Sequence, residues 1–400
     1  MPRALASLLA AVAVALVAMP STALGARPLG EIVSHDLHFA RTQLERALAE
    51  VPVDRYPNVI REPDGKWHSG PVTAWTSGFF PGCLWLMYKA TGDRAWRKAA
   101  ERRQAGLESQ KTRTSTHDLG FMLFDSFGRG YRLTGVDHYR QVVLTAAGSL
   151  ATRYSRAVGA IRSVNNPPGS DPSDFRVVVD NMMNLELLSW AAEHGGDPRM
   201  ATFALRHALT TARAHVRADG STFQLAVLDS RTGAVKRRGT AMGYSDSSTW
   251  ARGQAWALHG FTTVYRYTRN ARVLSAARRV ARYFVSHLPS DSVPPWDFDA
   301  PQSTNPPRDS SAAAIAASGL LDLSQLEPDA GRSSRDLKAA KAILRSLSSR
   351  AYLAEGTKSR SILLHGTSDW RHGPPDRGLI YGDYYFLEAL LRYRAIQPVR

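Results

Sequence analysis

The chain has 400 residues, with 51 lysines and arginines against 35 acidic residues, which gives a formal net charge of +16. Its single cysteine, Cys83, excludes a framework of disulfide bonds, so the fold has to depend on its core. The charge suits a polyanionic partner: a nucleic acid, a membrane surface or an acidic polysaccharide. The basic residues are scattered singly, without a Lys/Arg-rich run, so a compositional bias towards arginine and alanine is an equally good explanation.

The first 25 residues predict a cleavable secretory signal. Arg3 precedes a continuous apolar run from Leu8 to Met19, and small residues follow at Ala23 and Gly25. The run is shorter than the roughly 20 apolar residues that a membrane span needs, which disfavours an uncleaved anchor. No later stretch of the sequence is apolar enough to span a membrane. We therefore expect an exported protein, periplasmic or secreted, and this location disfavours a nucleic acid as its partner.

Residues 26–400 predict a single domain. They exceed the ~100–200 residues typical of one domain, but no linker rich in proline, glycine or serine divides them. Strand signals are scarce, whereas apolar residues recur at helical spacing in twelve segments. These segments are roughly 31–50, 78–91, 94–109, 118–133, 137–155, 181–194, 197–216, 249–268, 270–288, 310–323, 333–350 and 381–396. The sequence therefore predicts an all-α fold.

Short turns join these helices in pairs. The segments ATGD, LTGVD and HGGDP place a glycine and then Asp93, Asp137 or Asp197 between two helices. A glycine ends one helix and an aspartate caps the next, so each turn is tight. Asn270 makes a similar turn in TRNARV. Tight turns produce antiparallel helical hairpins, and six hairpins that close on themselves form an (α/α)6 barrel, a toroid.

Unusual residues gather just before and at the start of the even-numbered helices. The six segments are AWTSGFFPG at 74–82, THDLGF at 116–121, VVDNMMN at 178–184, SDSSTWARGQAW at 245–256, PPRDSS at 306–311 and LIYGDYY at 379–385. In a ring of hairpins these helix starts lie at the same end, so we expect the segments to surround one cavity. Six helix N-termini offer unpaired N–H groups and partial positive charge, which favour an anionic ligand.

Asp118 and Asp180 each stand at the start of an apolar helix, where the structural alternative is that they serve only as N-caps. Asp180 is followed by Asn181 and by a second asparagine one turn later, which is more polar character than a cap requires. Asp118 has His117 as a titratable neighbour. Gly120 is nearby, and its missing side chain lets backbone or a ligand approach closely. We therefore predict two carboxylates in one cleft, with environments that shift their pKa values apart.

Four tryptophans accompany the acids at this end of the predicted ring: Trp75, Trp250, Trp256 and Trp296. Aromatic rings beside polar groups can stack on sugars, although tryptophan is also ordinary core material. Arg252 lies four residues before Trp256 on one helix, so a guanidinium and an indole share a face and could hold the same sugar ring. The alternative for Arg252 is a buried ion pair.

The blocks HDLGF, VDNMMN, STWARGQAW and LIYGDYYFLEAL, in this order, resemble glycoside hydrolase family 88, the unsaturated glucuronyl hydrolases. The resemblance runs from about residue 70 to the C-terminus. It implies an (α/α)6 barrel that removes the unsaturated glucuronic acid from oligosaccharides left by polysaccharide lyases, with no metal or organic cofactor. It matches Asp180 to the acid/base of the family and Asp118 to the second essential aspartate.

The same resemblance implies a mechanism and a set of substrate contacts. Asp180 protonates C4 of the unsaturated sugar, water adds at C5, and the resulting hemiketal collapses to release the partner sugar. Because the target is an enol ether, the carboxylate spacing does not predict retention or inversion as it does for ordinary glycosidases. The implied substrate-binding residues are Trp75, His117, Ser248, Trp250, Arg252 and Trp256.

The sequence departs from the family at three positions that contact substrate in several members. Gln224, Met242 and Val164 stand where His, Gln and Trp are common. We expect unchanged chemistry with an altered substrate preference, or a different shell around the reacting water. Two other functions stay open: an unsaturated rhamnogalacturonyl hydrolase that acts on pectin fragments, and an exported glycan-binding protein without turnover. A helical cyclase is a more distant alternative.

Overall fold

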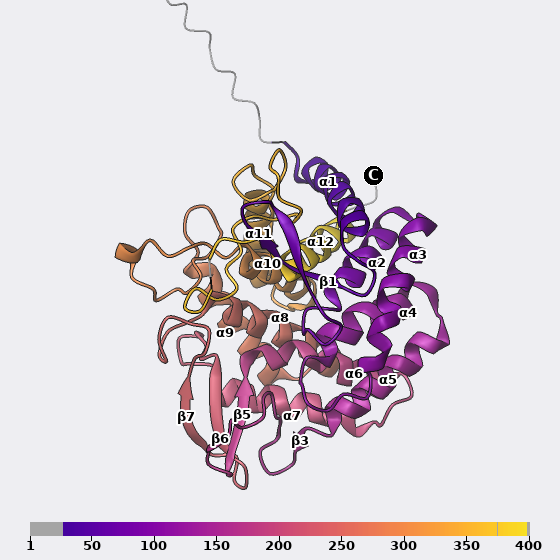
Figure 1. Cartoon of the computed structure of the whole chain (residues 1–400). Coiled ribbons are helices and arrows are strands. Elements are labelled where there is room, and N and C mark those ends of the chain that lie inside the picture. The colour runs from indigo at the N-terminus through magenta and orange to yellow at the C-terminus, as the bar shows by residue number, and fades with distance from the viewer. Residues whose placement is uncertain (1–26, 374, 398–400) are drawn as a thin grey trace, which may run out of the picture.

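The computed structural model describes residues 27–373 and 375–397, and the predicted signal at 1–25 lies outside this range. Twelve α-helices in the described residues form two concentric rings (Figure 1). The inner ring contains α2 (Phe79–Thr91), the π-helix η2 (Gly120–Gly128) with α4 (Arg129–Thr134), the 3-10 turn η3 (Val179–Asn184) with α6 (Leu185–Glu193), α8 (Ala251–Thr268), α10 (Ser310–Leu326) and α12 (Ile380–Ala395). The outer ring contains α1 (Leu29–Glu50), α3 (Arg94–Gln104), α5 (Asp137–Ala151), α7 (Arg199–Ala214), α9 (Ala271–Ser286) and α11 (Ala330–Leu347). Two short 3-10 turns, η1 (Ala105–Gln110) and η4 (Gln302–Thr304), complete the helical elements.

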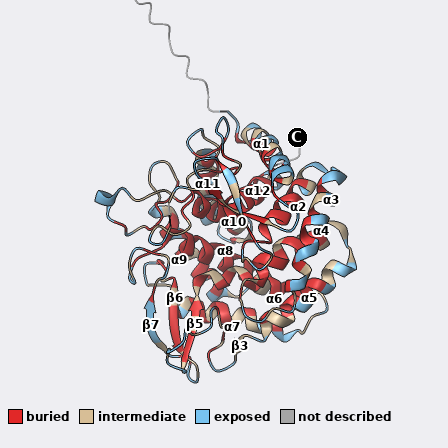
Figure 2. Ribbon diagram, in the orientation of Figure 1, coloured by how far each residue is buried: buried red, intermediate tan, exposed pale blue. Residues whose placement is uncertain are grey.

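The predicted (α/α)6 barrel is confirmed, and each of the twelve predicted segments corresponds to one helix of the two rings. The inner helices are buried on nearly every side, whereas the outer helices are buried only on the face that they turn inward (Figure 2). This difference follows from sequence, because α10 reads SSAAAIAASGLLDLSQL without a basic residue, while α9 alternates apolar residues with four arginines. No helix among the described residues is long and apolar enough to cross a membrane.

The turns between paired helices follow the prediction in part. The carboxylate of Asp93 caps α3 by accepting a hydrogen bond from the amide two residues later, at 2.8 Å. Asn270 caps α9 in the same way at 3.0 Å, and Asp197 accepts from the amide two residues later at 2.9 Å. The prediction is wrong for Asp137, which lies inside α5 and caps nothing, because its carboxylate forms an ion pair with Arg140 at 2.7 Å.

Seven short strands in the described residues lie in the connections between helices. They are β1 (Tyr56–Arg61) with β2 (Lys66–Gly70), β3 (Tyr154–Ser155) with β4 (Ala160–Ile161), and the sheet of β5 (Asp174–Val178), β6 (Leu225–Asp229) and β7 (Val235–Gly239), all antiparallel. The last residue of β5 pairs with Leu225. Since β5 runs directly into η3, this pairing fixes the place where Asp180 emerges.

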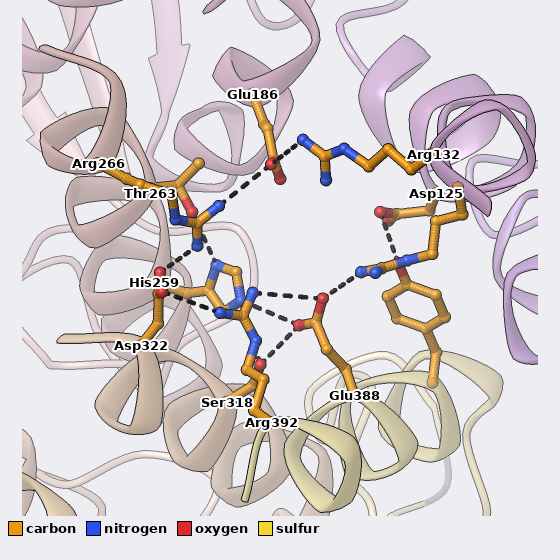
Figure 3. A network of polar contacts seen from close by, with 12 residues as sticks. Asp125, Arg132, Glu186, His259, Thr263, Arg266, Ser318, Asp322, Glu388 and Arg392 are labelled. Carbon is orange, nitrogen blue, oxygen red and sulfur yellow. Dashed lines mark hydrogen bonds and ion pairs between the residues drawn. The ribbon is translucent and has the colours of Figure 1, made fainter. Parts of the chain in front are cut away.

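A network of charged side chains crosses the centre of the inner ring (Figure 3). Glu388 of α12 pairs with Arg129 of α4 and lies 3.3 Å from His259 of α8. Arg266 of α8 approaches Glu186 of α6 at 3.3 Å. The arginines hold the pKa of Glu388 well below its usual range despite its burial. Asp322 of α10 pairs with both Arg266 and Arg392, so the network joins five inner helices. Each buried charge has a partner, and removal of one member leaves others uncompensated.

Candidate active site

An aromatic cluster forms where four inner helices begin. The ring of Trp75, which precedes α2, lies 5.5 Å from Phe121 in η2 and 5.2 Å from Tyr381 at the start of α12, between centroids. Trp256 of α8 lies 5.2 Å from Phe121. Trp75 is 36% exposed, whereas the other three rings are buried. The starts of these helices therefore converge, and the cluster presents one indole to solvent.

Asp180 lies in η3, between β5 and α6, and its side chain caps neither η3 nor α6. Its Oδ2 atom is buried and has no hydrogen-bond partner among the described residues. Burial, with a smaller contribution from the charge of Asp118, raises the pKa of Asp180 to about 6 against the opposing effects of His117 and Arg252. A carboxyl group that is partly protonated near neutral pH can act as a proton donor.

Asp118 lies just before η2 and also caps no helix. Its Oδ2 accepts a hydrogen bond from Oγ1 of Thr116 at 2.7 Å, and its Oδ1 is 3.3 Å from Nε2 of His117. Both N-cap alternatives are therefore wrong. Nδ1 of His117 is 2.8 Å from the carbonyl oxygen of Ser163. A carbonyl only accepts, so Nδ1 donates to it, and Nε2 is the ring nitrogen that faces Asp118.

Two contacts lock the Asp118 segment to the turn that carries Asp180. The amide of Phe121 donates to Oδ1 of Asn184 at 3.1 Å. Gly120 lies so close to Asn184 that a Cβ at position 120 would be 2.7 Å from that Oδ1 and 2.8 Å from the Cα. Only glycine fits this approach, and the two aspartates therefore sit on segments with a fixed separation.

Ser163 completes the support from a third direction, and no motif in the sequence indicates its role. Its Oγ accepts hydrogen bonds from the amide of Val178 at 2.9 Å and from Nδ2 of Asn181 at 3.2 Å. Its carbonyl oxygen contacts His117, as described above. One serine in an extended loop thus orients the histidine beside Asp118 and the asparagine beside Asp180.

Arg252 of α8 is buried and forms an ion pair with Asp309 at 3.1 Å. It also donates to two carbonyl groups in the loop before α12, at 2.5 and 2.6 Å. The contacts of Arg252 therefore confirm the alternative of a buried ion pair. The guanidinium carbon still lies 4.4 Å from the ring centroid of Trp250 and 5.2 Å from that of Tyr381. Trp256 is 6.5 Å from the same Tyr381 ring, so Arg252 and Trp256 share a face as predicted.

Ser248 and Trp250 are buried in the loop that leads into α8. Oγ of Ser248 donates to Oδ2 of Asp297 at 2.7 Å, and Trp250 forms an isolated β-bridge with Asp297. These contacts hold the loop against the segment that precedes α10. Their implied contact with substrate stays a prediction, as do the roles implied for Trp75, His117, Arg252 and Trp256. Trp296 is buried against Trp370, with centroids 5.4 Å apart.

Tyr381 is a candidate that the sequence analysis did not single out. Its hydroxyl is buried and lacks a hydrogen-bond partner among the described residues. Burial raises its pKa, and the negative charge of Asp180 adds to the shift while Arg252 opposes it, so all three lie near one another. Buried polar atoms normally have partners. Two such atoms, the hydroxyl of Tyr381 and Oδ2 of Asp180, are therefore available to a bound ligand.

The three departures from the family have distinct surroundings. Oε1 of Gln224 accepts hydrogen bonds from Oγ1 of Thr240 at 2.7 Å and from the amide of Met242 at 2.9 Å, and so fixes that loop. Val164 follows Ser163 and is 40% exposed. Tyr244, whose amide donates to Asp297, is 46% exposed. The border of the site is therefore partly apolar.

The fold is a ring of six helical hairpins, and one mouth of the ring holds two carboxylates, a buried guanidinium and an exposed indole. These features define the class of protein, which is a carbohydrate-active hydrolase on an (α/α)6 toroid. The model of Glycosyl Hydrolase Family 88 matches residues 46–294, and the chain belongs to this family. It is 41% identical over 330 residues to an unsaturated glucuronyl hydrolase of Formosa agariphila, covering 81% of each chain. It is 38% identical over 344 residues to an unsaturated glucuronyl hydrolase of Bacillus sp. strain GL1, covering 85% of this chain and 91% of the relative. The solved structure of an unsaturated glucuronyl hydrolase specific for heparin matches with a TM-score of 0.87 and 38% identity, over 92% of this chain and 98% of that one.

Proposed function

We propose that this chain is an unsaturated glucuronyl hydrolase, which removes the terminal 4-deoxy-4,5-unsaturated glucuronic acid from oligosaccharides made by polysaccharide lyases. The observation that carries the proposal is the carboxyl of Asp180: its Oδ2 is buried without a hydrogen-bond partner among the described residues, and its pKa is raised to about 6 with Asp118 and His117 nearby. The names of the relatives support the glucuronyl interpretation over the rhamnogalacturonyl alternative. A binding protein without turnover has no need of a proton donor.

The proposed reaction begins with transfer of a proton from Asp180 to C4 of the sugar. The C4–C5 double bond supplies the electron pair, and the ring oxygen shares the positive charge that develops at C5. Water then bonds to C5 and loses a proton to a neighbouring carboxylate. The hemiketal opens to a ketone, and the hemiacetal formed at C1 releases the partner sugar. We assign Asp118 and His117 to the orientation of the water, because Nε2 of His117 can accept a hydrogen bond from it.

The substrate class follows from the relatives and from the border of the site. One relative of known structure is specific for heparin, a glycosaminoglycan. We propose unsaturated glycosaminoglycan oligosaccharides as the substrates of this chain. We propose that the exposed side chains of Val164 and Tyr244 contact the second sugar. They favour a less charged face of that sugar.

The test is a panel of unsaturated disaccharides from chondroitin, hyaluronan, heparin, gellan and pectin, with the ultraviolet absorbance of the conjugated double bond as the readout. We expect the absorbance to fall for at least one glycosaminoglycan product. Persistence of the absorbance with every disaccharide would contradict the hydrolase assignment. A specificity profile identical to that of a relative with His, Gln and Trp at positions 224, 242 and 164 would contradict the predicted change in preference.

We also propose that residues 1–25 are removed on export and that residues 26–400 form a single catalytic domain, in the periplasm or outside the cell. The apolar run from Leu8 to Met19 after Arg3 supports this proposal. N-terminal sequencing of the protein recovered outside the cytoplasm should find a start near residue 26. An intact Met1 on the active, exported protein would contradict cleavage.

A further inference from the structure

Twelve of the basic residues that are scattered in the sequence lie on α7, α9 and α11. These are three consecutive helices of the outer ring (Figure 1). These helices carry three, four and five lysines and arginines, respectively. Their single acidic residue is Asp336. In contrast, α1 carries four acidic residues and two arginines. The three helices together carry a net charge of +11, whereas α3, elsewhere in the outer ring, carries five basic residues and one acidic residue.

Two grooves run between these helices. The groove between α9 and α11, of about 660 Å³, is lined by Arg278, Arg279, Arg282, Arg332 and Arg335. The groove between α7 and α9, of about 980 Å³, extends to the β3–β4 hairpin and is lined by Arg156, Arg206, Arg213, Arg272 and Arg279. Arg279 belongs to both sets, so the two grooves meet on α9. We call these nine arginines the arginine surface.

Much of the arginine surface is available to a ligand. Arg278 pairs with Glu327 at 2.5 Å and Arg332 with Asp329 at 3.4 Å. Four others are exposed and form no ion pair within 4 Å in the part of the chain that the structure describes: Arg206, Arg272, Arg282 and Arg335. Nε of Arg279 is buried and lacks a hydrogen-bond partner among the same residues. Concentrated, uncompensated guanidinium groups attract anions strongly.

Among the residues that line the two grooves, the single acid is Asp336, which compensates little of the arginine charge. Asp336 lines the groove between α9 and α11. Burial raises its pKa to about 7, with Glu327 adding to the shift and Arg335 opposing it. Near neutral pH Asp336 is therefore only partly ionised. The groove between α7 and α9 has no acidic residue among its lining side chains.

The chemistry of the grooves distinguishes among polyanions. Planar guanidinium groups bind sulfates and carboxylates through paired hydrogen bonds. The side chains that line the two grooves include no aromatic ring, although single-stranded nucleic acids are usually held by stacking on such rings. The large exposed apolar side chains of the described residues are Val53, Trp75, Val164 and Tyr244, and none lies on α7, α9 or α11. An insertion into lipid therefore has no anchor there.

We propose that the arginine surface binds an intact acidic polysaccharide, separately from the oligosaccharide that enters the active site. The choice of polysaccharide rests on the proposed function, because lyases release the substrate from such a polymer. The lining of the groove between α7 and α9 includes Gly159, four residues before the Ser163 that orients His117. A polymer held on the outer wall keeps the active site close to the place where new unsaturated ends appear.

The experiment compares two triple variants of the full chain that remove the same charge. The first is Arg206→Ser, Arg272→Ser and Arg282→Ser, on the arginine surface. The second is Arg94→Ser, Lys98→Ser and Arg102→Ser, from exposed positions of α3. The probe is long heparin without unsaturated ends, titrated at physiological salt, and turnover of an unsaturated disaccharide is measured on the same samples. We expect about tenfold weaker heparin binding in the first variant, near-parental binding in the second, and unchanged turnover in both.

Each other outcome has a definite meaning. Equal loss of heparin affinity in both variants would show a general attraction between charges and overturn the proposal, as would parental affinity in the first variant. Single-stranded DNA and phosphatidylcholine vesicles with phosphatidylserine serve as competing polyanions. If either binds more tightly than heparin and is lost only in the first variant, the surface has another occupant and the proposal is wrong. Heparin binding through this surface without disaccharide turnover would contradict the proposed function alone.

Discussion

Nε2 of His117 lies 3.3 Å from Oδ1 of Asp118, while the opposite ring nitrogen donates to the carbonyl of Ser163. His117 and Thr116 are the side chains that contact the carboxylate of Asp118. Among the described residues, the buried Oδ2 of the nearby Asp180 has no hydrogen-bond partner, and burial raises the pKa of this group to about 6. Two aspartates on neighbouring inner helices thus have different environments, which suits one acid and one water-orienting group.

The pH dependence of turnover should report the proton donor. If Asp180 must be protonated, kcat/KM should fall tenfold per pH unit above about pH 6, because its pKa is raised to about 6. Initial rates from pH 4 to 9 with one unsaturated disaccharide measure this limb. A rate that is constant between pH 6 and 8 would remove Asp180 from the role of acid.

Asp180→Asn should separate activity from stability. We expect turnover to fall by roughly 10²–10⁴-fold, since the variant has no proton to donate. The folded-state pKa is above the unfolded value, so the parent loses stability as the pH rises from about 4 to 6, and the variant does not. At pH 7 the variant should be more stable by about 3 kcal/mol, and the gain should vanish below about pH 4. Urea unfolding at both pH values checks the sign, and a variant that is less stable at pH 7 would contradict the buried charge.

Gly120→Ala should disturb the separation of the two aspartates. The new Cβ would lie 2.7 Å from Oδ1 of Asn184, so the Asp118 segment has to move. We expect a loss of about 1–3 kcal/mol in stability and a larger than tenfold fall in kcat. Gly148→Ala in α5 is the control, because its Cβ would meet no atom within 4 Å and should stabilise the helix by about 0.5–1 kcal/mol. Equal effects of the two substitutions on kcat would contradict the role of Gly120.

Tyr381→Phe removes a buried hydroxyl that has no partner among the described residues. Stability should stay the same or rise slightly, because no protein hydrogen bond is lost. If a bound sugar pairs with this hydroxyl, KM should rise by about tenfold, which corresponds to about 1.4 kcal/mol. Steady-state kinetics together with thermal unfolding test both parts, and an unchanged KM would place the hydroxyl outside the substrate contacts.

Glu388→Ala should destabilise the inner ring. The substitution leaves Arg129 and Arg392 without a shared acidic partner, so we expect a loss of about 3–5 kcal/mol. Glu45→Ala on α1 is the matched control, since its ion pair with Arg41 at 2.9 Å is exposed and contributes about 0–1 kcal/mol. Similar melting temperatures for the two variants would contradict a structural role for the network.

The helices and their pairing were predictable because the signals are local. Apolar residues at helical spacing reflect which face each helix buries, and caps such as Asp93 and Asn270 act within one turn of chain. Asp137 shows the limit of such signals, because the carboxylate that could have capped α5 pairs with Arg140 instead. The motif blocks identified the family through their order along the chain, which needs no knowledge of contacts.

Tertiary structure decided what each side chain touches. Asp309 holds Arg252 from a position 57 residues away, and Ser163 bonds to elements on both sides of the cleft. The orphaned hydroxyl of Tyr381 and the concentration of arginines on α7, α9 and α11 also depend on the closure of the ring. The sequence by itself determined the helices, the ring and the two aspartates, since these follow from periodicity and order. Partners, burial and pKa values depend on distances across the chain, and only the folded ring sets those distances.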